Sequence, residues 1–151
     1  MFFELSIIIN RSPIDVFSFL RDKDSFKQKS NSPVLIIEKT TSGPPYVGTR
    51  YREVVQMLPL IRGEILSEIT RFEPEKYLEE DFKGAGMRGH IAYQFLSINN
   101  ETKLIQKEIL LLSRFLKPFE PIIKHVFFQR LRKRLDGIKV ILESGWSPNQ
   151  N

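Results

Sequence analysis

Apolar residues recur at helical spacing along the last long segment of the chain, residues 115–143. They stand three or four positions apart, which places them on one face of a helix. These apolar positions are Phe119, Ile123, Phe127, Leu131, Leu135, Ile138 and Leu142. At about 1.5 Å per residue the segment is roughly 40 Å long, so its apolar face needs a large partner surface. Pro118 and Pro121 fall in the first turns and predict an irregular entry near Phe119.

Most of the remaining chain alternates apolar and polar residues, which is typical of strands with one buried face. The predicted strands cover residues 3–9, 34–40, 48–57, 62–72, 77–82, 90–95 and 104–112. Ser12 and Pro13 begin a short helix after the first strand, as N-cap and first helical residue. A second short helical turn is predicted at residues 25–28. The connections are short, so consecutive strands are expected to pair as a meander.

These elements predict an α+β fold in which a curved, seven-stranded antiparallel sheet surrounds a long C-terminal helix. Two short helices follow the first strand. The 151 residues suit one domain, which we place at residues 1–145. We expect the polar tail, residues 146–151, to be frayed. The helix's C-terminal half should close against the sheet at Leu135, and its N-terminal half should cover a pocket at Phe127.

Composition excludes several classes of protein. The chain has no cysteine, which excludes disulfides, a thiol nucleophile and thiolate metal sites. A net charge of +5 gives a mild attraction to anions, but no basic stripe alternates with exposed aromatics, so no nucleic acid is expected. No apolar run approaches the length of a membrane span, and the first residues do not resemble a secretion signal. We therefore expect a cytoplasmic protein.

Two histidines, His90 and His125, are far apart in sequence, and both are predicted to face outward. No metal site is therefore expected. The chain also has no phosphate-binding loop and no dinucleotide fingerprint, so no cofactor is predicted. Twelve phenylalanines either fill the space between sheet and helix or line a pocket for an apolar ligand.

Glu53 and Tyr93 are the candidate catalytic residues. Glu53 shares strand parity with Tyr51 and Val55, which are assigned to the inner face. A carboxyl group facing an apolar interior would have a raised pKa and can serve as general acid, general base or anchor for a ligand hydroxyl. The alternative is a glutamate that reaches water or pairs with an arginine. Tyr93 has the same inward parity, either as a pocket-lining hydroxyl or as plain core.

A basic run of four residues lies in the predicted long helix: Arg130, Arg132, Lys133 and Arg134. Helical spacing turns Arg132 and Lys133 outward, whereas Arg130 and Arg134 flank the apolar face. Arg134 can lay its stem over the core with its head in water. The run is interpreted as a solvated face, with an anionic ligand head group, peripheral contact with a membrane surface or a protein partner as the alternatives.

Four local motifs resemble one known family. They are residues 7–13 followed by Val16 and Phe17; residues 44–51; Glu68-Ile69 with Phe72-Glu73-Pro74; and Leu135, Ile138-Lys139 and Leu142-Glu143. Their order and spacing resemble the polyketide cyclase/dehydrase-like branch of the Bet v 1-like, START-related (SRPBCC) superfamily. They are scaffold motifs, so they carry little chemistry.

The resemblance implies a helix-grip fold with a cavity between sheet and helix. Members bind or transport hydrophobic small molecules such as lipids, sterols and polyketides, and some cyclise or dehydrate polyketides. The first hypothesis is thus a non-enzymatic binder or carrier of such a molecule. The candidate ligand-binding residues are Tyr51, Glu53, Tyr93, Phe95, Phe119, Ile123 and Phe127. The alternative is a cyclase or dehydratase in which Glu53 is the acid/base and Tyr93 an orienting donor.

Overall fold

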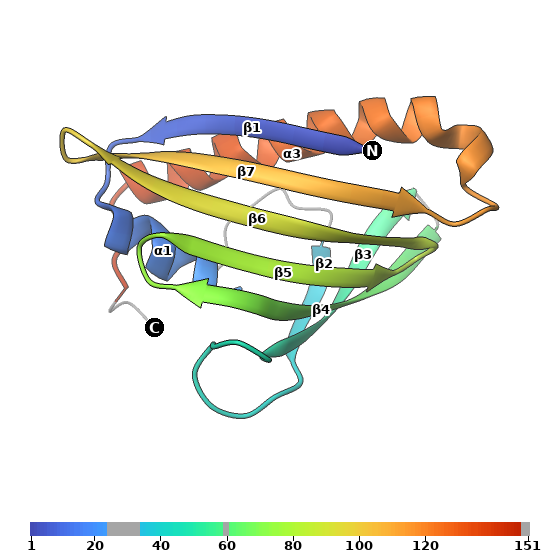
Figure 1. The fold of residues 1–151 in the computed structure, drawn as a ribbon, viewed down its shortest axis with the longest axis horizontal. Helices are drawn as coiled ribbons and strands as arrows, with labels where there is room; N and C mark the ends of the chain where they lie inside the picture. The colour runs from blue at the N-terminus through green and yellow to red at the C-terminus, as the bar shows by residue number, and fades with distance from the viewer. Residues whose placement is uncertain (24–33, 59–60, 149–151) are drawn as a thin grey trace.

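A computed structural model of the protein describes residues 1–23, 34–58 and 61–148. The predicted α+β fold, with seven antiparallel strands and a long C-terminal helix, is confirmed (Figure 1). The elements are β1 (Phe2–Ile9), α1 (Pro13–Arg21), β2 (Val34–Lys39), β3 (Arg50–Leu58), β4 (Ile61–Glu73), β5 (Tyr77–Gly84), β6 (Met87–Ile98), β7 (Glu101–Leu112), the 3₁₀ turn η1 (Lys117–Phe119) and α3 (Glu120–Glu143). The second short helix, predicted at residues 25–28, lies outside the described residues.

The strands form one antiparallel sheet in the order β1-β7-β6-β5-β4-β3-β2. Strands β2 to β7 pair consecutively, as the short connections predict, and β1 joins the free edge of β7. The β6–β7 hairpin turns at Asn99 and Asn100, whose φ angles of 46° and 68° are both left-handed. Asparagine tolerates this conformation better than most residues, which explains the pair at this turn.

The long helix lies along the β1 side of the sheet (Figure 1). Its entry is irregular as predicted, because η1 ends at Phe119 and the α-helix begins only at Glu120. Phe119 is 56% exposed, so its predicted place on the sheet-facing side is wrong. The residue stands at the junction of η1 and α3, outside the regular turns that carry the buried face. Within the described ranges, no helix is long and apolar enough to cross a membrane.

The start of α1 follows the predicted capping pattern. The Ser12 side chain accepts a hydrogen bond from the Asp15 amide, and Pro13 occupies the first turn. The helix then buries Phe17 and Phe19 in the core. Trp146 packs edge-on against Phe19 with ring centroids 5.3 Å apart, so its predicted place in a frayed tail is wrong.

The core consists of two hydrophobic clusters. The larger one lies around α1 and the C-terminal half of α3, and the smaller one contains Phe3, Phe82, Leu110 and Leu131, with Phe127 packed against it. Ile91 and Leu5 touch both clusters. On β4, β5 and β7 the inward residues that stand between the two clusters are polar, and they form part of the candidate site.

Candidate functional site

The polar residues between the two clusters belong to seven different segments of the chain. We call this group the polar belt: Lys23, Glu53, Ser67, Glu80, Tyr93, Gln106, Glu108 and Arg134. Strand alternation explains how the sequence brings them together. On β5, Glu80 stands between Leu78 of the larger cluster and Phe82 of the smaller one. Inward positions of β4 and β7 stand between the two clusters in the same way, whereas Glu53 on β3 and Tyr93 on β6 lie next to Tyr51 and Phe95 of the larger cluster.

Lys23 is the centre of one half of the belt. It follows the end of α1 and is only 8% exposed. Its ammonium group donates to Glu53 Oε1 at 2.8 Å and to Ser67 Oγ at 2.9 Å, and it forms an ion pair with Glu80 Oε2. The ammonium nitrogen also lies 5.0 Å from the centre of the Tyr51 ring. One buried cation thus connects β3, β4 and β5.

The pKa of Glu53 differs from the sequence-based expectation. Burial opposes ionisation of this carboxyl, but the charge and hydrogen bond of Lys23, with a contribution from Arg134, lower its pKa below the ordinary value. The expected raised pKa is therefore wrong, because the sequence does not show Lys23 beside the carboxyl. The inward orientation of Glu53 is confirmed by its buried ion pair. Its catalytic role, and that of Tyr93, stay predictions.

The other half of the belt lies on β7 and α3. Gln106 Nε2 donates a hydrogen bond to Glu108 Oε2 at 3.1 Å. Burial raises the pKa of Glu108 to about 7, although the Arg134 charge and the Gln106 hydrogen bond both oppose the rise. The Glu108 carboxyl can therefore take up or release a proton near neutral pH, which is the property a general acid or base needs.

Two belt atoms are buried without a partner among the described residues: the Tyr93 hydroxyl and Gln106 Oε1. Burial raises the pKa of Tyr93, so the phenol keeps its proton. The Arg134 guanidinium carbon lies 5.9 Å from the centre of the Tyr93 ring. The interpretation of Arg134 with its head in water is thus wrong, since the guanidinium is turned toward the belt.

The belt is difficult to explain as a stabilising feature. Buried ion pairs rarely stabilise a fold more than apolar residues of the same volume would, because desolvation offsets their attraction. A buried polar atom without a partner destabilises the fold further. Strongly perturbed titrating groups that lie close together are a recognised mark of functional sites. We therefore take the polar belt as the candidate functional site.

The predicted ligand-binding residues are only partly brought together. Tyr51, Tyr93 and Phe95 are buried on the inner face of the sheet, and Glu53 lies beside Lys23. On α3, Ile123 and Phe127 are half-buried. The exposed Phe119, described above, is the member that the structure separates from this set.

Sequence reasoning missed five residues of the belt: Lys23, Ser67, Glu80, Gln106 and Glu108. A signal existed for the four on strands, because they share parity with buried apolar residues in the alternating pattern. A polar residue at an inward position of a strand whose other inward residues are apolar is unusual, and it can be recognised in the sequence. Lys23 gave no such signal, since it follows α1 outside any periodic segment.

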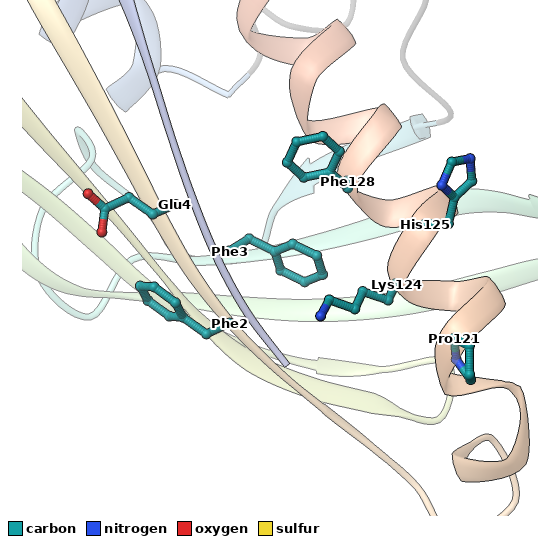
Figure 2. Close-up of a pocket in the computed structure, with 7 residues that line it drawn as sticks. All are labelled: Phe2, Phe3, Glu4, Pro121, Lys124, His125 and Phe128. Carbon is teal, nitrogen blue, oxygen red and sulfur yellow. The ribbon is translucent and has the colours of Figure 1, made fainter.

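Two open grooves lie outside the belt, along the seam between β1 and α3, with volumes of about 490 Å³ and 400 Å³. The larger is lined by Phe2, Phe3, Glu4, Pro121, Lys124, His125 and Phe128 (Figure 2). In Figure 2, Phe3 points from β1 toward the helix, whereas Phe2 and Glu4 project from the other face of the strand. Neither groove is lined by a predicted ligand-binding residue.

The remaining charged candidates lie on the surface. His90 Nδ1 is 2.7 Å from Asp81 Oδ1 on the outer face of the sheet, and His125 is exposed on α3, both as predicted. Arg132 and Lys133 are exposed, which agrees with their predicted outward orientation. Contact of this basic run with a membrane or another partner stays a prediction.

Neither a family model nor a curated protein matches the sequence. Solved structures do match over almost the whole chain. TTHA0849 from Thermus thermophilus has a TM-score of 0.79 at 16% identity, covering 97% of this chain and 100% of its own. Ara h 8.0201 has a TM-score of 0.76 at 14% identity, covering 96% and 99%. A START superfamily protein from Mycobacterium smegmatis has a TM-score of 0.80 at 9% identity, covering 95% and 97%.

At such low identities the likeness concerns the fold and leaves the chemistry open. Strand order, the pairing of β1 with β7 and the position of the long helix all agree with this likeness. The chain therefore has the Bet v 1-like helix-grip fold, in which an antiparallel seven-stranded sheet packs on a long C-terminal helix.

Proposed function

We propose that the protein binds a hydrophobic small molecule between the inner face of the sheet and α3, with the polar belt holding the molecule's polar group. The observation that carries this proposal is the belt itself, in which Tyr93 and Gln106 each leave a buried polar atom without a partner among the described residues. Apolar clusters on both sides supply surface for a hydrophobic body. The helix-grip fold, which commonly binds hydrophobic molecules, adds support.

Entry of a ligand requires space between helix and sheet, and the N-terminal half of α3 is the part best suited to move. All five buried residues of α3 lie from Leu131 onward. In the first half, Ile122 is 66% exposed and Val126 is 41% exposed. Segments with few buried apolar contacts open at low free-energy cost. We therefore place the entrance beside Phe127, at the end of the smaller cluster.

The alternative of a cyclase or dehydratase stays a prediction. Its proposed acid/base, Glu53, is held as an ion-paired carboxylate by Lys23. Glu108 suits proton transfer better, because its pKa of about 7 lies near the working pH. Binding is proposed first because the unpartnered atoms need only a bound polar group, and no reaction.

A matched pair of substitutions in α3 tests the binding site. Phe127 packs against Phe3 with ring centroids 6.0 Å apart, whereas its neighbour Phe128 lines the outer grooves. We expect the neutral fluorescent probe N-phenyl-1-naphthylamine to bind the wild-type protein. Phe127→Ala should weaken binding about fivefold to thirtyfold through the loss of roughly 1–2 kcal/mol of apolar contact. Fluorescence titration measures both variants, with circular dichroism as a check that each is folded.

Phe128→Ala is the control and should leave the affinity unchanged, because its ring does not face the interior. If Phe128→Ala weakened binding and Phe127→Ala did not, the bound probe would lie in the groove between β1 and α3 instead. Failure of the wild-type protein to bind neutral apolar probes would contradict the proposed function itself.

A further inference from the structure

The two unpartnered atoms of the belt come from residues that face each other directly. Tyr93 on β6 and Gln106 on β7 are partners in the strand register. Both side chains lie on the inner face, where Tyr93 is 1% exposed and Gln106 is fully buried. Directly opposed side chains in an antiparallel pair have Cβ atoms only about 4.5–5.5 Å apart, so their polar ends can converge on one small group. The Tyr93 hydroxyl and Gln106 Oε1 can thus be satisfied by the same bound atom.

The chemistry of the two atoms defines that group. The amide oxygen of Gln106 only accepts a hydrogen bond, and its Nε2 already donates to Glu108. The Tyr93 phenol carries a proton that it can donate. A single ligand oxygen that satisfies both atoms must therefore accept a hydrogen bond from the Tyr93 hydroxyl and donate one to Gln106 Oε1. A hydroxyl group does both, whereas a ketone, an ether or a carboxylate oxygen cannot donate.

The charges around the pair favour a neutral ligand. The two cations of the belt, Lys23 and Arg134, face the carboxyl groups of Glu53, Glu80 and Glu108. A ligand carboxylate would compete with these glutamates for the cations, and a ligand ammonium would compete with the cations for the glutamates. Burying an additional charge without its own partner is strongly unfavourable.

We infer that the interior selects an uncharged hydrophobic molecule with a hydroxyl group, an alcohol or a phenol, whose oxygen bridges the Tyr93 hydroxyl and Gln106 Oε1. This inference rests on the proposed function and adds the class of ligand to it. The apolar body extends toward Phe82 and Phe127 of the smaller cluster, next to the proposed entrance.

Two ligands of almost equal shape test the inference: 2-naphthol, and 2-methylnaphthalene, in which a methyl group replaces the hydroxyl. A purely apolar site binds the methyl compound more tightly, because that compound is the less soluble in water. The wild-type protein is expected to show the opposite order, with 2-naphthol bound about tenfold more tightly. Naphthalene-2-carboxylate should bind more weakly than 2-naphthol. Isothermal titration at pH 7 measures all three.

Two substitutions and one control locate the preference. Tyr93→Phe removes only the phenolic oxygen and should reverse the order, so that 2-methylnaphthalene binds more tightly. Tyr77→Phe makes the same change on the outer face, where the Tyr77 hydroxyl accepts from Gln94 at 3.2 Å, and should keep the wild-type order. Gln106→Met gives a second variant and should also lose the preference for 2-naphthol.

The outcomes separate this inference from the proposed function. Binding of both naphthalenes with the methyl compound preferred would overturn the hydroxyl site and leave the apolar interior standing; the two atoms would then be bridged by water. A naphthol preference that survives Tyr93→Phe would overturn the assignment of the site to this pair. If neither compound binds, the proposed function is contradicted.

Discussion

Leu135→Ala is expected to lower the free energy of unfolding by about 3–5 kcal/mol, a large part of the stability of a typical domain. Leu135 is 3% exposed and belongs to the larger hydrophobic cluster. Truncation leaves a cavity that the neighbouring residues of the sheet and of α1 cannot fill, because protein interiors are close-packed. Urea denaturation monitored by circular dichroism measures the loss.

Truncation of Phe127, in the N-terminal half of the same helix, should lower the free energy of unfolding much less. Phe127 is half-buried and borders the proposed entrance, so fewer packing contacts vanish in Phe127→Ala. We expect a loss of about 1–2 kcal/mol, together with the weaker probe binding described above. Equal losses in the two variants, or the reverse order, would show that the space for a ligand lies at the other end of α3.

Lys23→Met should also destabilise the protein by about 3–5 kcal/mol at pH 7. Methionine has a similar length but no charge, so Glu53 and Glu80 lose the cation that lies between them. Removing one partner of a buried ion pair lowers the stability more than replacing all the partners, since the remaining charge is uncompensated. Chemical denaturation at several pH values measures the effect.

The pH dependence of this loss has a definite sign. The pKa of Glu53 is lowered in the folded protein, so its stabilisation is present above the unfolded pKa and is lost as pH falls through the folded value. Without Lys23, burial raises the pKa of the same carboxyl, and the folded variant gains stability by taking up a proton as pH falls. The difference between wild type and variant should therefore shrink from pH 7 to pH 4.

Lys107→Met is the matched control, because Lys107 forms an ion pair with Glu4 at 3.6 Å on the surface, where both side chains are about half exposed. Surface pairs of this kind contribute at most about 1 kcal/mol. If Lys23→Met cost no more than Lys107→Met, the belt would not be the buried charge network described here. Adding Glu53→Gln and Glu80→Gln to Lys23→Met should restore much of the lost stability.

The sequence predicts the architecture well, because periodicity reports which side chains are buried. Alternation placed Tyr51, Tyr93 and Phe95 on the inner face, and helical spacing placed Leu135 against the sheet, and all four are buried. Short connections predicted the meander, since they leave adjacent strands no other partner. The same signals failed at Phe119, where a 3₁₀ turn interrupts the helix and shifts the face.

The candidate site was less accessible to sequence reasoning, because its chemistry depends on contacts between distant segments. Glu53 was found by parity, but its pKa depends on Lys23, which is thirty positions away and outside any periodic element. Glu108 had the parity of an inward residue between Leu104 and Leu110. Its raised pKa, however, depends on burial between the sheet and α3, which exists only in the folded protein and which the charge of Arg134 opposes.

The location of a bound ligand between sheet and helix is tested most directly by fluorine NMR of protein labelled with 3-fluorotyrosine. The chain has four tyrosines. Tyr51 and Tyr93 are buried in the interior, whereas Tyr46 is 63% exposed and Tyr77 lies on the outer face. Single Tyr→Phe variants assign the resonances. Addition of 2-naphthol should shift the resonance of Tyr93, and less strongly that of Tyr51, and leave Tyr77 and Tyr46 unchanged. Shifts confined to the resonances of Tyr77 or Tyr46, with the Tyr93 resonance unchanged at saturation, would contradict a ligand site between the sheet and α3.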